Sequence, residues 1–150
     1  MDIDIVASFF VANKRNVVIM NLVFQTQGRV VDAYNTFSCI LTQLGETIPE
    51  SVSPEAATGM ITETVNMFEE IYDDEWKRTN MEDETLRATV QFYCGMALAA
   101  YFFKPRTIVT WYTCRAVQLC LRKGMCKHCP IALVQLTVLA LNRDNIPCML

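Results

Sequence analysis

Glycine and proline residues divide this chain into segments whose apolar residues recur at helical spacing. Between Gly28 and Gly45, large apolar residues follow one another at intervals of three and four from Val30 to Leu44. Such intervals place apolar side chains on one face of an α-helix, and a glycine directly after the last turn is a common helix terminator. The sequence therefore predicts short amphipathic helices joined by tight turns.

Six helices are predicted in this way, and the first two precede a polar connection, ETIPESVSP. The first covers residues 5–26, where the β-branched segment NVVIMNLVF leaves helix and strand both open, and the second covers residues 30–44. Ser53 is the expected N-cap of the third helix, with Pro54 at its first position. Its apolar face is expected to consist of Ile61, Val65, Phe68, Tyr72 and Trp76.

The three remaining helices follow residue 84. The fourth lacks acidic residues after Glu84 and is expected to be central; its apolar face comprises Leu86, Val90, Tyr93, Ala97, Tyr101 and Phe102. Pro105 breaks the chain, and the fifth helix runs from Arg106 to Arg122. Its apolar face comprises Val109, Tyr112, Ala116, Val117, Cys120 and Leu121. Gly124 ends it, and Pro130 opens the sixth, which ends near residue 142.

The composition limits the classes of protein that fit. Hydrophobic residues make up 52% of the chain, with only five glycines and five prolines, which argues against disorder and a turn-rich β fold. The longest uncharged apolar runs, 90–103 and 130–141, are shorter than the ~20 residues that span a bilayer. We therefore expect no membrane span, and no signal peptide is evident because acidic residues stand where a basic region belongs.

Charge is unevenly distributed along the chain. Residues 46–84 hold twelve acids and two bases, whereas residues 85–150 hold eight bases and one acid. Either the two regions pair with each other, or a basic surface meets an acidic partner. The basic residues are scattered and carry no nucleic-acid motif, so no nucleic-acid partner is expected. Membrane-surface association remains a further alternative, although the amphipathic stretches are explained by burial.

Motifs of catalysis are missing from the sequence. It contains no G-x-x-x-x-G-K-[ST], G-x-S-x-G or H-E-x-x-H segment, and His128 is the single histidine. The acidic runs at 73–75 and 82–84 are typical of solvated helix ends rather than of acid–base catalysts. The sequence predicts a protein that is not an enzyme and has no cofactor.

Seven cysteines, an odd number without regular spacing, predict reduced and buried thiols in a cytoplasmic protein. The stretch RKGMCKHCPIAL places His128 between Cys126 and Cys129, and these three are the candidate metal ligands. Structural zinc needs four ligands and one C-x-x-C pair supplies two; Cys114, Cys120 and Cys148 are possible additions. Alternatives are an oxidant-sensitive thiol at a helix start, or only the corner of a helical hairpin.

The first predicted hairpin is similar to a tetratricopeptide (TPR) repeat. Gly28 takes the place of the glycine between the two helices, Ala33 the small residue where they cross, and Phe37 the aromatic residue one turn later. Met20 and Phe24 fit the large apolar positions of the first helix. Asn21 and Ile40 depart from the pattern, which covers about one repeat of ~34 residues.

A longer pattern, from residue 21 to residue 141, resembles the TPR-like helical region of large predicted ATPases in multidomain signalling proteins. The matching residues are Leu44, Gly45, Glu46 and Pro49, then Met81, Asp83 and Leu86, then Ala100, Tyr101, Phe102 and Pro105, and finally Leu121 and Gly124. Such proteins often carry a protein kinase, histidine kinase or nucleotide cyclase domain. In this family, small residues stand where Cys126 and Cys129 stand here.

The resemblance implies an all-α array of antiparallel helical hairpins of α-solenoid type. Residues 1–150 would form one array, with a degenerate TPR hairpin at 1–45 and further hairpins at 54–142, as a fragment of a larger protein. Its implied function is that of a non-catalytic interaction or scaffold module that contacts a protein partner or neighbouring domains. The alternative is a redox-sensitive or zinc-binding protein that uses Cys126 and Cys129. The expected helix-junction and packing residues are Gly28, Ala33, Phe37, Gly45, Pro105, Gly124 and Pro130.

Overall fold

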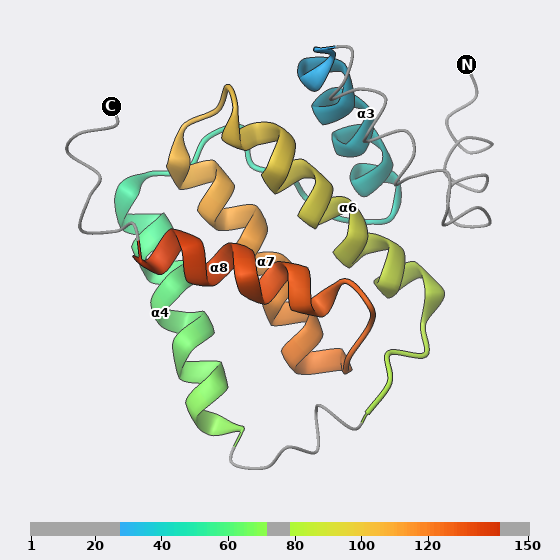
Figure 1. Ribbon diagram of the computed structural model, residues 1–150, viewed down its shortest axis with the longest axis vertical. Coiled ribbons are helices and arrows are strands. Elements are labelled where there is room, and N and C mark those ends of the chain that lie inside the picture. The colour runs from blue at the N-terminus through green and yellow to red at the C-terminus, as the bar shows by residue number, and fades with distance from the viewer. Residues whose placement is uncertain (1–27, 72–78, 142–150) are drawn as a thin grey trace.

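Five α-helices account for most of residues 28–71 and 79–141, the part of the chain that this computed structural model describes (Figure 1). They are α3 (Val30–Gln43), α4 (Pro54–Glu70), α6 (Glu84–Tyr101), α7 (Arg106–Lys123) and α8 (Cys129–Leu141). These residues contain no strand beyond a single bridge between Asn80 and Met125. The all-α prediction is confirmed, and five of the six expected helices are present. The expected helix at 5–26 lies outside the described residues.

The long helices α6 and α7 form a hairpin in the middle of the fold (Figure 1). Helix α3 packs on α6, whereas α4 and α8 both pack on α7. Two successive hairpins, α6–α7 and α7–α8, are therefore present, but α3 and α4 are covered by helices that lie later in the sequence. Helix α7 is the most enclosed, and all six residues predicted for its apolar face are buried.

Aromatic side chains of three helices meet in the core. Phe37 of α3 packs against Phe92 of α6, with ring centroids 5.7 Å apart. The Tyr34 and Tyr112 hydroxyls form a buried hydrogen bond of 2.6 Å. Because a buried hydroxyl without a partner costs about 1–3 kcal/mol, this pair fixes how α3 lies against α7.

The register of α4 differs from the prediction at Val65, which is 45% exposed. Ser53 caps the helix as predicted, since its hydroxyl accepts a hydrogen bond from the Ala56 amide at 3.1 Å. The side of α4 that faces α7 instead contains Thr64, which is fully buried and whose hydroxyl accepts a 3.0 Å hydrogen bond from the side-chain Nε2 of Gln118. This polar contact turns Thr64 rather than Val65 inward. Of the other predicted residues, Ile61 and Phe68 are partly buried, and Tyr72 and Trp76 lie outside the described residues.

The end of α6 also departs from the prediction. Tyr101 and Phe102 were expected on the buried face but are 60% and 63% exposed. The contacts near this end come from alanines such as Ala97 and Ala100, which are almost fully buried. Their small size lets α6 and α7 approach closely, so the two large aromatic rings project beyond the hairpin.

The predicted junction residues lie at helix ends or in the core. Gly28, Gly45 and Gly124 have positive φ angles of 67°, 92° and 103°. Pro105 directly precedes α7, Pro130 is the second residue of α8, and Ala33 and Phe37 are buried in α3.

Gly124 has a second constraint besides its backbone angle. A Cβ atom here would lie 2.7 Å from the carbonyl oxygen of Thr79. The Thr79 carbonyl accepts a 2.8 Å hydrogen bond from the Met125 amide, and the Met125 carbonyl accepts one of 2.8 Å from the Met81 amide. The turn after α7 is thereby fixed to the segment that leads into α6.

Acidic and basic regions of the chain pair with each other. Arg115 of α7 contacts Glu46 at 3.2 Å, and Arg122 contacts Glu63 of α4 at 3.6 Å. The hydroxyl of Tyr93 donates a further hydrogen bond to Glu46 at 2.7 Å. These contacts support the interpretation in which the uneven charge serves internal pairing.

Candidate functional site

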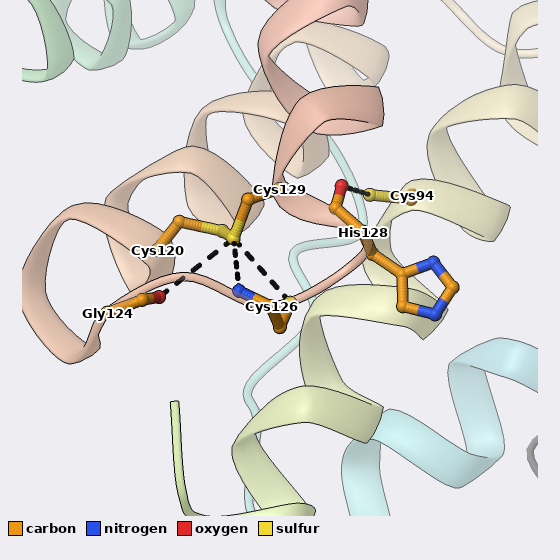
Figure 2. The surroundings of a disulfide bond; sticks show 6 residues. All are labelled: Cys94, Cys120, Gly124, Cys126, His128 and Cys129. Atoms are coloured by element: carbon orange, nitrogen blue, oxygen red, sulfur yellow. Dashed lines mark hydrogen bonds between the residues drawn. A yellow bond between two sulfur atoms is a disulfide. The ribbon is translucent and has the colours of Figure 1, made fainter. Parts of the chain in front are cut away.

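Three cysteines come together where α7 ends and α8 begins. Figure 2 shows Cys120 near the end of α7, Cys126 in the turn and Cys129 as the first residue of α8. Their Sγ atoms all lie within 4.8 Å of one another. Cys120 and Cys129 form a disulfide, and the Sγ of Cys126 is 3.5 Å from the Sγ of Cys129.

The turn geometry explains why these sulfurs meet. Gly124 takes a backbone conformation that other residues rarely adopt, and it reverses the chain after α7. The Cys129 amide then donates a 3.1 Å hydrogen bond to the Cys126 carbonyl, and the Cys126 amide donates one of 3.1 Å to the Cys129 sulfur. The Cα atoms of Cys120 and Cys129 are 6.1 Å apart, within the range that a disulfide bridges.

The disulfide corrects the prediction that the cysteines are all reduced. Four other cysteines in the described residues are free, namely Cys39, Cys94, Cys114 and Cys126, and Cys148 lies outside them. The sequence placed Cys120 on the apolar face of the fifth helix and among the additional zinc ligands, but not in a disulfide. Its position one turn before the end of α7 was visible in the sequence, but the reversal at Gly124 that brings it to Cys129 was not.

The predicted metal candidates are only partly brought together. Cys126 and Cys129 adjoin, but the imidazole of His128 points away from the three sulfurs (Figure 2). Burial, and then the charge of Lys127, lowers the pKa of His128, so its ring is neutral at pH 7. Its Nε2 atom is buried without a hydrogen-bond partner among the described residues.

Cys94 approaches the same turn from α6. Its sulfur lies 4.0 Å from the carbonyl oxygen of His128. Burial and the nearby Cys126 raise the pKa of Cys94 to about 12, so this thiol is protonated at pH 7. A protonated thiol is a poor nucleophile, and the Cys94 sulfur is not among those that lie within 4.8 Å of one another, so the cluster consists of Cys120, Cys126 and Cys129.

Helix α8 is a second candidate region for function. It contains no charged residue. Its inner side is formed by Cys129, Ala132, Leu136 and Leu139, which are buried. Its outer side carries the exposed residues Ile131, Val134, Val138 and Leu141. We call these four residues the outer face of α8. Their spacing of three, four and three places them on one side of the helix.

An open groove of about 220 Å³ runs beside this face. It is lined by residues of three helices, with Leu98 and Tyr101 from α6, Val109 from α7, and Val134 and Val138 from α8. None of the described residues that line it is charged. Helices that are apolar all round are normally covered on all sides, so an uncovered apolar side of α8 is unusual.

No family model, no curated protein and no solved structure matches this chain. Among the described residues, no helix has both the length and the apolar character needed to cross a membrane. The resemblance to the TPR-like region of signalling ATPases therefore remains a prediction. What the geometry offers for function is the three-cysteine cluster and the outer face of α8.

Proposed function

We propose that this chain is a non-catalytic helical interaction module, and that the outer face of α8 docks an apolar-faced helix from a neighbouring domain of a larger protein. The observation that carries the proposal is that α8 lacks any charged residue while one of its sides is exposed. Covering that side would remove from water the exposed part, about half to three quarters, of four large apolar residues, each of which gains about 1.5–3 kcal/mol when it goes from fully exposed to fully buried.

The proposed occupant is a helix because the groove is lined by side chains of neighbouring helices. Val134 and Val138 line it from α8, and Leu98 and Tyr101 line it from α6. Helix surfaces pack by placing the ridge of one helix into such a groove. Since the described residues that line the groove carry no charge, the inserted side of the partner helix would also be uncharged, with apolar residues at i, i+3, i+4 and i+7.

A neighbouring domain is favoured over a separate peptide by the way this fold covers its own helices. The α6–α7 and α7–α8 hairpins stack through apolar sides, and in a helical array each unit leaves a side for the next one. The resemblance to the helical region of signalling ATPases supports the same placement, in a chain with nucleotide-switching and output domains. Four thiols in the described residues are free, which favours a reducing compartment such as the cytoplasm, whereas the Cys120–Cys129 disulfide is a feature that is rare there.

The test is site-specific photo-crosslinking in the cells that make the protein. A diazirine analogue of leucine replaces Val134, and in a matched variant it replaces Val65, an exposed valine on α4. We expect Val134 to crosslink to one helical segment with an apolar stripe, and Val65 to give no such product. Adding Val138→Glu should abolish the product.

Three results would overturn the proposal. One is the same set of products from both positions, which would indicate random collisions. The second is crosslinking of Val134 to lipid alone, and the third is crosslinking only to a second copy of this chain.

A further inference from the structure

We propose that Cys120, Cys126 and Cys129 form a thiol–disulfide exchange site, in which Cys126 connects the buried Cys120–Cys129 disulfide to small thiols in solution. This inference does not depend on the function proposed for α8. It rests on the positions of the three sulfurs, their different exposure and the hydrogen bond to Cys129.

Cys129 is the sulfur shared by two partners. The Cys129 sulfur is bonded to the Cys120 sulfur, and the Sγ of Cys126 lies 3.5 Å from it (Figure 2). Exchange begins when a thiolate attacks one sulfur of a disulfide. The distance between the Cys126 and Cys129 sulfurs is close to van der Waals contact. Holding the two groups together replaces a collision by an intramolecular step, which raises the effective concentration of the attacking thiol.

Exposure gives the three cysteines different roles. Cys120 is 1% exposed and Cys129 is fully buried, so a thiol in solution cannot reach either sulfur directly. Cys126 is partly exposed in the turn between the helices. It is therefore the member of the set that both solvent and the disulfide can reach.

The internal step is balanced without any added reactant. The Cys126 thiolate attacks the Cys129 sulfur, so the Cys126–Cys129 bond forms and the Cys120–Cys129 bond breaks. Cys120 leaves as a thiolate and takes up, through solvent, the proton that Cys126 released. Cys126 is oxidised and Cys120 is reduced to the same extent, so the oxidation state of the protein as a whole is unchanged and the disulfide has moved toward solvent.

Reduction then requires two molecules of a small thiol such as glutathione. The first attacks the exposed Cys126 sulfur, forms a mixed disulfide and releases Cys129 as a thiolate. The second attacks the mixed disulfide at the glutathione sulfur, which gives the Cys126 thiol and glutathione disulfide. Two electrons pass from the two glutathione molecules to the protein, and the reverse sequence with glutathione disulfide restores the starting state.

The surroundings of Cys129 favour it as the leaving group in the second stage. Its sulfur accepts a hydrogen bond from the Cys126 backbone amide at 3.1 Å. It also belongs to the first residue of α8, where the backbone amides of a helix start favour negative charge. Both features stabilise a thiolate on Cys129.

A structural zinc site explains the same cluster less well. Tetrahedral zinc takes four protein ligands in structural sites, and the described residues supply three sulfurs here. The imidazole of His128 points elsewhere, and Cys94 does not belong to the group of sulfurs within 4.8 Å of one another. Zinc binding is therefore an outcome that the test must detect.

The experiment follows reduction of the oxidised full chain by glutathione at pH 7.5. Samples are alkylated at intervals, and mass spectrometry measures the fraction of Cys120 that has become free. We expect Cys126→Ser to slow release of Cys120 at least tenfold, and the matched variant Cys39→Ser, at an exposed cysteine far from the turn in sequence, to leave the rate unchanged. We also expect Cys120→Ser to accumulate the Cys126–Cys129 disulfide on oxidation.

Equal rates for the wild type and Cys126→Ser would overturn the proposal, because the buried disulfide would then be reached without Cys126. Stoichiometric zinc bound by three reduced cysteines in the protein purified without chelator would also overturn it. Cys126→Ser keeps the backbone amide that contacts Cys129, so the turn is expected to be retained. Circular dichroism of each variant checks that the helices are retained.

Discussion

Replacing Glu46 with alanine should destabilise the fold far more than removing the acid of an exposed ion pair. Glu46 follows α3 and accepts hydrogen bonds from the Nε and Nη2 atoms of Arg115, both at 3.2 Å, and from the hydroxyl of Tyr93 at 2.7 Å. One carboxylate thus joins the end of α3 to α6 and α7. Burial and then the hydrogen bond from its hydroxyl to Glu46 raise the pKa of Tyr93, so the phenol stays a donor.

The expected loss follows from the exposure of the pair. The side chains of Glu46 and Arg115 are 14% and 27% exposed. Removing one partner of a fully buried pair costs about 3–5 kcal/mol. Because water reaches about a quarter of Arg115, we expect Glu46→Ala to lower the free energy of unfolding by about 2–3 kcal/mol. Glu46→Gln keeps an acceptor for Tyr93 and should cost less.

The matched control is Glu63→Ala, which removes the acid that contacts Arg122 at 3.6 Å. Both side chains of that pair are about half exposed, and such pairs contribute ~0–1 kcal/mol. Urea denaturation followed by circular dichroism at pH 7 measures both variants, with unchanged m-values as the check on two-state unfolding. If Glu46→Ala and Glu63→Ala destabilise the protein equally, the role assigned to Glu46 is wrong.

Three further predictions concern single residues. Gly124→Ala should lower the free energy of unfolding by about 2–4 kcal/mol because of the positive φ of Gly124 and the nearby Thr79 carbonyl. Gly59→Ala, inside α4 with free space around it, should raise the free energy of unfolding by about 0.5–1 kcal/mol. Thermal and urea denaturation measure both variants, and a loss at Gly59 equal to that at Gly124 would contradict the reasoning. Because the pKa of His128 is lower in the folded protein than in the unfolded chain, the unfolded chain takes up a proton at this residue first as the pH falls. The contribution of neutral His128 to stability is therefore present above pH ~6.5 and is lost as the pH falls below that value. His128→Gln should flatten the decline in stability between pH 7 and pH 5, and an unchanged decline would refute the buried position assigned to His128. Removing the bridge with Cys120→Ser in a Cys126→Ser background, which prevents the alternative Cys126–Cys129 disulfide, opens a loop with a sequence separation of nine and should lower the free energy of unfolding by about 2.6 kcal/mol relative to oxidised Cys126→Ser. Equal unfolding midpoints of the two variants under oxidising conditions would show that Cys120 and Cys129 are not bridged.

Local spacing was sufficient for most helix positions. The predicted apolar face of α7 is buried in full, and the N-cap at Ser53 and the helix end at Gly45 are where the sequence placed them. These features depend on residues within one or two turns of each other, and the intervals in the sequence report them directly.

Contacts between distant residues were not accessible from spacing. The spacing of apolar residues along α4 allows either Val65 or Thr64 to face inward. The hydrogen bond from Gln118, which lies 54 residues further along the chain, holds Thr64 on the buried side. The cysteine cluster has the same origin. The C-x-x-C spacing identified Cys126 and Cys129, but the pairing with Cys120 depends on the chain reversal at Gly124, which the spacing does not describe.

The most direct test of the account is carbene footprinting of the outer face of α8, in the purified chain and in the protein inside its own cells. We predict strong labelling of Val134 and Val138 in the purified chain and at least fivefold weaker labelling in cells, with Val65 of α4 labelled equally in both. Equal labelling of Val134 and Val138 in the two settings would contradict the claim that this face docks a neighbouring helix.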